Sequence, residues 1–292
     1  MNINLSGREE TIKMFDEVCK KIDIKPTKED IENLVVYEMT DGTRTSFDFK
    51  NDGWKGYYEG GIFCLRFMHM LKHLGGKNIY FNVIHERHKQ RVNYEDIYRG
   101  LMSLVEPYSE YLKNNDIKIK FVGDYKESIA PNKAENDLRL GLKKVEEMTK
   151  NNNEFNAYVM LNYSALQLAR EGGELWNAAP PCTVILRHCK GYVNGDMWLP
   201  GKLDNHTFVY AQNGTISMNW TDKQILYLIG LSLRSYILNK GGHYSKIYGE
   251  GENERIKRQR EQELYMEHKK LEETVNKRVV LFGVVGPEVY EF

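Results

Sequence analysis

The feature that most constrains this chain is the alternation of short apolar runs with segments whose apolar residues recur at helical spacing. The apolar runs are residues 34–37, 78–84, 117–122, 155–161, 183–186 and 206–210. The helical segments are residues 57–74, 93–114, 134–150 and 222–239. Strands that alternate with helices through short turns form a mostly parallel sheet with helices packed on it. The sequence therefore predicts an α/β fold with a central, mainly parallel sheet of about six strands, flanked by helices on both faces.

The N-terminal residues carry two helix-start signals. Ser6 and Glu9 have the spacing of a capping box, and the helix that they predict has an apolar face of Ile12, Phe15, Val18, Cys19 and Ile22. Thr27 and Asp30 form a second box, which predicts a short helical turn. Residues 1–33 are therefore expected to be an N-terminal helical segment.

The C-terminal part differs in composition from the rest. Residues 253–277 are highly charged and predict an exposed helix, and residues 279–285 predict a late strand. Because residues 250–292 thus end on a strand after the charged helix, we predict a single domain over residues 1–292.

Charge and cysteine content exclude several classes of protein. Lys plus Arg number 41 and Asp plus Glu number 41, whereas general nucleic-acid binders carry a basic excess. No apolar run reaches the ~18 residues of a membrane span, although a transient contact with a membrane surface stays open. The N-terminus has no signal-peptide pattern. Cys19, Cys64, Cys182 and Cys189 form no C-x-x-C motif, as expected for free thiols in a cytoplasmic protein.

The loop after the first predicted strand is the main candidate site, because ligands of open parallel sheets bind at the carboxyl ends of strands. It contains Asp41, Gly42, Thr43 and Arg44. Backbone N–H groups near a glycine can surround phosphate oxygens, and the planar fork of Arg44 can bind two of them. Asp41 can hold Mg²⁺ beside them. Taken alone, the same pattern also fits an Asp-Gly turn with a solvated arginine.

Four further motifs follow this loop in order. They are Phe121-Val122-Gly123-Asp124-Tyr125-Lys126, Asn162-Tyr163, Val184-Ile185-Leu186-Arg187 and Trp220-Thr221-Asp222. Together with the loop, they resemble the cis-prenyltransferase (undecaprenyl diphosphate synthase) superfamily, whose first loop reads M-D-G-N-G-R-W. The loop here is more similar to the D-G-T-R-R-W-F of the tuberculosinyl transferase or tuberculosinol synthase branch. The resemblance runs from about residue 34 to the C-terminus.

The resemblance implies roles for individual residues. Asp41 and Tyr58 correspond to the catalytic aspartate and tyrosine of the branch, and Asp41 is also the implied Mg²⁺ ligand. The implied diphosphate-binding residues are Gly42, Thr43, Arg44, Arg91 and Arg187. The implied isoprenoid tunnel residues are Phe63, Phe67, Met70 and Leu71, which also fit an ordinary helix core. Members of the superfamily dimerise, so the resemblance implies a homodimer.

This chain also departs from the family pattern. Thr45 stands where the branch has a second arginine, and His85-Glu86-Arg87-His88 replaces the superfamily's S-x-E-N. Ser164-Ala165-Leu166 replaces G-G-R, and the acceptor segment S-G-E-x-R-x-S-N-F has no counterpart in residues 188–206. The first diphosphate site is therefore expected to persist, while the second is remodelled.

The predicted function is that of a terpene synthase or prenyltransferase, which ionises a long allylic isoprenoid diphosphate of C15–C25. Diphosphate leaves, and the carbocation is quenched by a nucleophile, by proton loss or by cyclisation, so the enzyme is a transferase or a lyase. Two alternatives stay open. One is a chain-elongating cis-prenyltransferase that uses isopentenyl diphosphate, and the other is a non-catalytic isoprenoid-binding subunit.

Two histidine pairs complete the list of candidates. His69 and His73 have the spacing of metal ligands but no third ligand nearby in the sequence, so a structural place on the helix is favoured. His85 and His88 follow the second predicted strand, where a diphosphate contact is an alternative to a structural role.

Overall fold

The computed structural model describes most of the chain as one sheet with its helices. The described residues are 5–40, 53–123, 133–171, 177, 179–187, 193, 198–203, 207–211, 220–239, 258, 260–262, 264, 265, 278–283 and 286–291. The main sheet has the strand order β3-β4-β2-β1-β5-β6, and every pairing in it is parallel. Its strands are β1 (Val35–Met39), β2 (Asn78–Asn82), β3 (Ile117–Val122), β4 (Phe155–Met160), β5 (Val184–Arg187) and β6 (Phe208–Ala211). The predicted parallel sheet of about six strands is confirmed.

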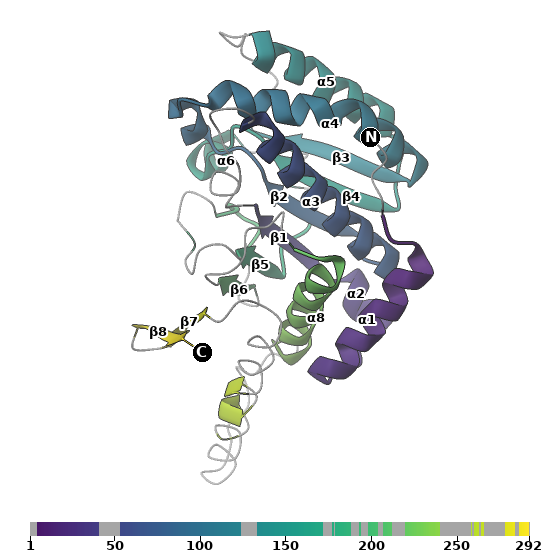
Figure 1. Ribbon diagram of the computed structural model, residues 1–292, viewed down its shortest axis with the longest axis vertical. Coiled ribbons are helices and arrows are strands. Elements are labelled where there is room, and N and C mark those ends of the chain that lie inside the picture. Colours follow the sequence, from purple (N-terminus) through teal and green to yellow (C-terminus); the bar gives the residue numbers. More distant parts are fainter. Residues whose placement is uncertain are drawn as a thin grey trace.

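Five helices cover one face of this sheet (Figure 1). They are α1 (Arg8–Ile22), α3 (Gly53–Leu74), α4 (Tyr94–Asn114), α5 (Lys133–Thr149) and α8 (Asp222–Asn239). Their buried side chains join those of the strands in one large core. The short elements α2 (Lys28–Glu32) and η2 (Glu86–Gln90) lie between them in the chain.

The other face of the sheet carries a shorter helix and irregular chain. Among the described residues, its cover consists of α6 (Ala165–Glu171) and irregular chain that contributes Ala179, Cys182 and Leu199 to a second core. Helices thus flank the sheet as predicted, but the described helix on this face is short, with seven residues. The reason is visible in the sequence, because Gly172-Gly173, Pro180-Pro181 and Pro200-Gly201 interrupt this stretch and disfavour a long helix.

The start of α3 shows packing overriding helix propensity. The sequence analysis predicted this helix only from residue 57, and glycine is a poor helix former, yet Gly53 and Gly56 are both buried within α3. A Cβ on Gly100 of α4 would lie 2.5 Å from the carbonyl oxygen of Trp54 and 2.7 Å from Tyr57 Cβ. The two helix backbones thus approach too closely for a larger residue at this point. Tertiary packing stabilises a helical turn that the local sequence does not favour.

One of the two capping boxes predicted near the N-terminus is confirmed, and the other is not formed. Thr27 and Asp30 form the predicted capping box, but α1 begins after Gly7 with no side-chain cap. Ile12 is 38% exposed, and the buried position beside it belongs to Thr11. The helix therefore starts one residue later than the box at Ser6 predicted, because Ser6 makes a different bond.

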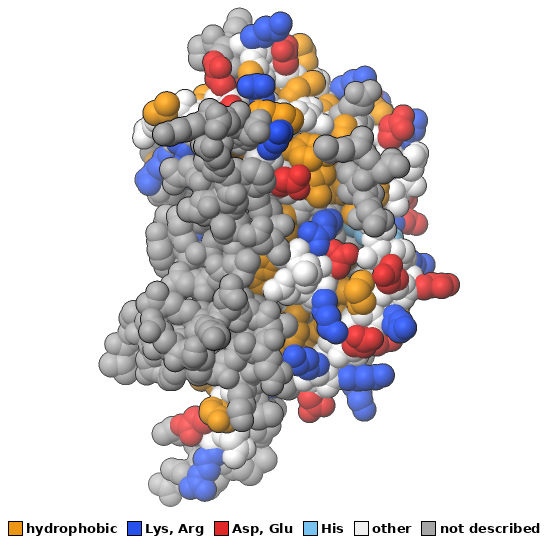
Figure 2. All heavy atoms as spheres, viewed as in Figure 1, with side chains coloured by type: hydrophobic (Ala, Val, Ile, Leu, Met, Phe, Trp, Pro, Cys, Tyr) orange, Lys and Arg blue, Asp and Glu red, His pale blue; other side chains and the backbone are white. Residues whose placement is uncertain are grey.

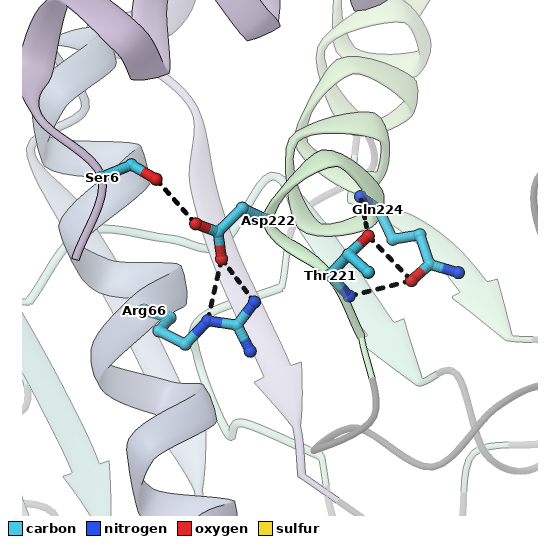
Figure 3. A network of polar contacts seen from close by, with 5 residues as sticks. All are labelled: Ser6, Arg66, Thr221, Asp222 and Gln224. Carbon is cyan, nitrogen blue, oxygen red and sulfur yellow. Dashed lines mark hydrogen bonds and ion pairs between the residues drawn. The ribbon is translucent and has the colours of Figure 1, made fainter. Parts of the chain in front are cut away.

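Ser6 belongs to a polar network that ties three helices together (Figure 3). Its hydroxyl donates to Asp222 Oδ2 at 2.8 Å, and Arg66 of α3 donates to Asp222 Oδ1 from Nε at 2.9 Å and from Nη2. Thr221 and Gln224 cap the start of α8, with Thr221 N–H donating to Gln224 Oε1 at 2.8 Å. Asp222 thus connects the starts of α1 and α8 to the middle of α3.

The C-terminal strand prediction was confirmed in part. β7 (Arg278–Gly283) pairs with β8 (Gly286–Glu291) as an antiparallel hairpin separate from the main sheet. The sequence analysis did not predict β8, which contains Pro287; proline is tolerated in an edge strand. Within 253–277, the described residues 258, 260–262, 264 and 265 are helical and exposed. None of the helices in the described ranges has the length and apolar character needed to cross a membrane.

Asp222→Ala should lower the free energy of unfolding by about 1–3 kcal/mol. The substitution removes a partly buried ion pair and leaves the Arg66 guanidinium without this carboxylate. Urea unfolding measures the change. The matched control is Lys223→Ala, which removes an ion pair with Glu17 that is more than half exposed and should cost at most ~0.5 kcal/mol. Equal losses in the two variants would contradict a structural role for the Asp222 network.

Candidate active site

The carboxyl edge of the sheet is the natural place for a ligand, because all six main strands point the same way. β1 leaves this edge at Met39, and α3 begins at Gly53. The candidate residues Asp41, Gly42, Thr43 and Arg44 lie between them and are outside the described residues. Their roles stay a prediction. The surroundings of this loop are described and can be examined.

An apolar cavity of about 100 Å³ lies between the helices and the strands next to this edge. It is enclosed by parts of α3, α4, α5, β2, β3 and β4, together with the residues that follow β2 and β4. Its lining residues are Gly61, Cys64, Phe81, Val83, Leu101, Leu104, Val105, Tyr108, Leu112, Ile119, Phe121, Leu142, Val145, Val159 and Leu161. A cavity with this lining suits a hydrocarbon and not a charged or strongly polar ligand.

The wall formed by α3 and α4 depends on a small residue. A Cβ on Gly61 would collide with Leu104 Cδ1, so Leu104 sits directly over this glycine. Tyr108, one turn further along α4, donates its hydroxyl hydrogen to the Gly61 carbonyl oxygen. Burial raises the pKa of Tyr108 well above its usual range, with Cys64 and Tyr58 adding to the shift. Its hydroxyl therefore stays protonated, and its bond links the two helices.

The outer surface of the cavity helices is also partly apolar. Figure 2 shows hydrophobic side chains gathered in the upper part of the molecule, where Figure 1 places α4 and α5. Met102 and Leu140 are among the exposed apolar residues of these two helices. Gly141 packs its backbone against Val105 and Met102. The same helix pair thus has one apolar side in the cavity and apolar residues on its exterior.

The four tunnel residues predicted from the sequence lie beside the cavity, in the core. Phe63, Phe67, Met70 and Leu71 are almost fully buried, and the rings of Phe67 and Phe81 meet edge to face at 6.5 Å. On α3 the cavity lining consists of Gly61 and Cys64. The two sets occupy neighbouring stripes of the same helix, because a turn takes 3.6 residues. A role for the predicted four in binding a tail stays a prediction.

The remaining predicted residues lie on different parts of this edge. Tyr58 is in the second turn of α3, half-buried, and burial followed by the charge of Glu59 raises its pKa. Arg91 follows η2, where its N–H donates to the carbonyl oxygen of His88 at 3.0 Å. Arg187 ends β5 and is 2% exposed. By strand alternation it shares the face of Ile185, which is opposite the cavity.

The two histidine pairs have structural partners. His69 Nε2 lies 2.8 Å from the Ser6 carbonyl oxygen, and its Nδ1 lies 2.5 Å from the Tyr111 hydroxyl. His88 Nδ1 accepts the backbone N–H of His85, and His85 Nδ1 accepts that of Arg87. The second pair therefore shapes the turn after β2. No group of three or more potential metal ligands occurs among the described residues.

Sequence reasoning missed a buried polar network at the end of β4. Glu135 and Arg139 of α5 form an ion pair of 2.5 Å, and both are nearly inaccessible. Asn162 Nδ2 donates to Glu135 Oε1 at 3.3 Å, while its Oδ1 accepts from the Tyr98 hydroxyl at 3.3 Å. Glutamate and arginine four apart on a predicted helix were a usable signal. The network fixes Asn162, which has a positive φ of 50°.

Cys64 is a poor candidate for a nucleophile. Burial is the main cause that raises its pKa to about 12, the hydrogen bond with Thr40 works in the opposite direction, and the nearby Glu38 charge adds to the rise. Thr40 Oγ1 lies 3.4 Å from Cys64 Sγ. Because the thiolate is the reactive form, the thiol serves as a packing group in the cavity wall.

At pH 8, Cys64 should therefore react with iodoacetamide on the order of 10³-fold more slowly in the folded protein than in urea. The factor follows from a rise of three units, from 9.0 to about 12, which reduces the thiolate fraction accordingly. Cys19, with a pKa raised to about 11 mainly by burial, is the internal comparison and should be slowed less. Mass spectrometry of the two peptides measures both rates. Equal rates for Cys64 in the folded and unfolded protein would show that its thiol is not suppressed.

Comparison with known proteins identifies the fold but no family. The chain matches no family model and no curated protein. It is similar to the crystal structure of lavandulyl diphosphate synthase from Lavandula x intermedia in complex with dimethylallyl diphosphate, with 15% identity and a TM-score of 0.57. That match covers 76% of this chain and 99% of that chain. A probable undecaprenyl diphosphate synthase from Campylobacter jejuni matches at 14% identity and a TM-score of 0.48, over 68% of this chain and 94% of its own. The first of these matches confirms the expected fold, and the likeness to the tuberculosinyl branch stays a prediction.

Proposed function

We propose that this chain is a prenyltransferase-type enzyme that breaks the bond between an allylic isoprenoid group and its diphosphate. The observation that supports the proposal best is the apolar cavity next to the carboxyl edge of the sheet. A hydrocarbon tail fits such a lining, and a diphosphate fits the polar loop that follows β1. The similar fold of a diphosphate synthase solved with dimethylallyl diphosphate agrees with this assignment.

The diphosphate is assigned to the loop with Asp41, Gly42, Thr43 and Arg44. Backbone N–H groups near Gly42 and Thr43 and the guanidinium of Arg44 stabilise the departing negative charge. α3 is the next described element in the chain after this loop, and the N-terminal end of a helix carries a partial positive charge. Arg91 and Arg187 are assigned as further diphosphate contacts. Tyr58, near the start of α3, is assigned to the carbocation, since an aromatic face stabilises positive charge.

Magnesium fits the proposed headgroup site by its donor set. Mg²⁺ in such sites is held by one or two carboxylates together with phosphate oxygens and water. Asp41 would supply the carboxylate, and the substrate the phosphate oxygens. When bound, the ion neutralises negative charge on the leaving diphosphate. Asp41 itself orients the ion or, in a reaction without metal, acts as a base.

The cavity volume limits the length of the tail. A cavity of about 150 Å³ is known to hold one benzene molecule, so about 100 Å³ suits roughly one five-carbon unit. The C15–C25 substrates expected from the sequence require the cavity to lengthen between α3 and α4. Leu104 and Leu112 are the α4 side chains assigned to this adjustment, because they line the cavity one and three turns beyond Leu101.

The proposal also includes the features that the sequence predicts for the whole chain. These are a single domain, a homodimer and a cytoplasmic location. The carbocation is quenched by a nucleophile, by proton loss or by cyclisation. Coupling to isopentenyl diphosphate is the competing reaction, and binding without catalysis is the competing role. An assay with allylic diphosphate alone distinguishes ionisation, chain elongation and binding without catalysis.

Allylic diphosphate alone should be sufficient for the reaction, and Asp41 should be needed. We expect the wild type to release diphosphate from geranyl, farnesyl or geranylgeranyl diphosphate without isopentenyl diphosphate. Asp41→Asn should reduce turnover by on the order of 10²-fold, since a charge that acts in the transition state is removed. A coupled phosphate assay and mass spectrometry of products are the measurements.

Asp52→Asn is the matched control, because it makes the same change in the same segment. Product that forms only with isopentenyl diphosphate and grows by five-carbon units would support chain elongation instead. Binding of these substrates without any turnover would support the non-catalytic role. Full activity in Asp41→Asn would remove Asp41 from the site.

The side chains that line the cavity should determine which substrate chain length the enzyme prefers. Leu104→Ala and Leu112→Ala should shift relative turnover toward longer diphosphates, because each removes a side chain that limits the cavity. Each should also cost about 2–5 kcal/mol of stability, so measurements are restricted to folded protein. Leu71→Ala is the control, because Leu71 is equally buried but does not line the cavity. If the tail instead binds along the residues predicted from the sequence, relative turnover should shift toward longer diphosphates in Phe63→Ala and Phe67→Ala. It should then stay unchanged in the two α4 variants.

A further inference from the structure

Glu38 is a carboxylate in the middle of the central strand. It has no exposed surface. Its neighbours in register are Phe81 of β2 and Leu186 of β5. Glu38 lies on the helix-covered face, because Val36 belongs to the core on that face while Tyr37 and Met39 belong to the opposite core. An ionisable residue that occupies such a position calls for an explanation beyond packing.

Glu38 is next to the apolar cavity. Phe81, its partner in the neighbouring strand, is a lining residue, and so is Cys64, which lies above β1 on α3. Thr40, two residues further on the same side of the strand, contacts Cys64 at 3.4 Å. The influence of the Glu38 charge on the Cys64 thiol, secondary to burial, is consistent with this closeness.

Glu38 also lies at a suitable depth. A strand rises about 3.3 Å per residue, so Glu38 is roughly 7 Å below Thr40, the last described residue before the Asp41 loop. In the proposed function the diphosphate is assigned to that loop, and the first carbons of the allylic chain would then extend toward the level of Glu38. Under that assignment, the Glu38 carboxyl group would lie near the carbons where positive charge develops when diphosphate leaves.

We propose that Glu38 is the base that ends the reaction by taking a proton from the carbocation. This inference rests on the proposed function and assigns one of its three quenching routes. The C1–O bond breaks, and its electron pair leaves with diphosphate. The positive charge spreads over C1 and C3, and Glu38 accepts a proton from a carbon attached to C3. The C–H electron pair becomes a new double bond, so the product is a conjugated hydrocarbon, and Glu38 later returns the proton to water.

Glu38 lies beside the lining residues and is not one of them, and the polar groups that line the cavity or bind its lining are less suited to this step. The Cys64 thiol stays protonated, and the Tyr108 hydroxyl donates to the Gly61 carbonyl oxygen. Glu146 is bonded to a lining residue, but it accepts the backbone N–H of Phe121 at 2.9 Å on the edge strand β3. A carboxylate beside an apolar cavity also stabilises a cation there, because the surroundings have a low dielectric constant.

The test compares Glu38→Gln with Glu146→Gln, which makes the same change in another carboxylate near the lining. Geranyl and farnesyl diphosphate are the probes, and released diphosphate, hydrocarbon and alcohol are measured separately. We expect Glu38→Gln to keep releasing diphosphate, while its hydrocarbon-to-alcohol ratio falls by on the order of 10²-fold because water replaces the missing base. Glu146→Gln should retain the wild-type ratio. An unchanged ratio in folded Glu38→Gln overturns the inference.

Glu38→Met, which has a similar volume and no charge, is the second variant if Glu38→Gln does not fold. If neither folds, wild-type enzyme is given substrate deuterated on the carbons attached to C3. A hydrocarbon that has lost one deuterium supports proton abstraction, whereas an undiminished label or a product with no hydrocarbon overturns it. Failure of the proposed function has a different signature, because the wild type would then release no diphosphate from either probe.

Discussion

Parallel pairing on both sides of β1 is the constraint on which the rest of the molecule depends. β2 and β5 both run parallel to β1, so its five residues are buried on both faces and its carboxyl end opens at the same edge as theirs. Two consequences follow from this one arrangement. The segment after Met39 must leave at the carboxyl edge, where ligands of open parallel sheets bind, and an ionisable residue within the strand, Glu38, cannot reach water. The central strand thus determines where the candidate site and an internal carboxyl group lie along the sheet.

The cavity arises from how closely the helices approach one another over this sheet. Gly100 lets the backbone of α4 come near the start of α3, and Gly61 makes room for Leu104. Protein interiors are normally filled to the density of organic crystals, so a space lined by fifteen mostly apolar residues represents unused packing stabilisation. The Asp222 network, which connects three helices on the same face, helps to offset that loss. A cavity that is retained at a cost in stability is more easily explained by a ligand than by the fold.

Local sequence signals were most successful where no distant residue competes with them. The Ile117–Val122 strand, the Thr27 capping box and the Asp222–Asn239 helix are confirmed at their predicted limits. The start of α3 was missed because Gly100 belongs to another helix, and the Ser6 cap was wrong because its hydroxyl bonds to Asp222 instead. The resemblance implied an apolar tunnel along α3, but the lining of the cavity could not be predicted, since the cavity is a volume left between side chains of six elements. The helical period revealed the apolar character of α3, but not which of two adjacent stripes borders that space.

The positions of charged residues along β1 and its loop suit the charge separation of the proposed reaction. Allylic ionisation separates an anion from a cation, and each needs its own surroundings for the separation to be favourable. In the proposed reaction, Arg44 and the N-terminal end of α3 would supply positive charge where diphosphate leaves, and the Glu38 carboxyl group would lie beside the apolar region. A cavity lined only by aliphatic and aromatic groups would hold the tail equally well, yet it would leave the cation to be quenched by whatever water entered. A single buried carboxylate changes the outcome, because it favours the charge-separated state and also provides an acceptor for the proton that neutralises it.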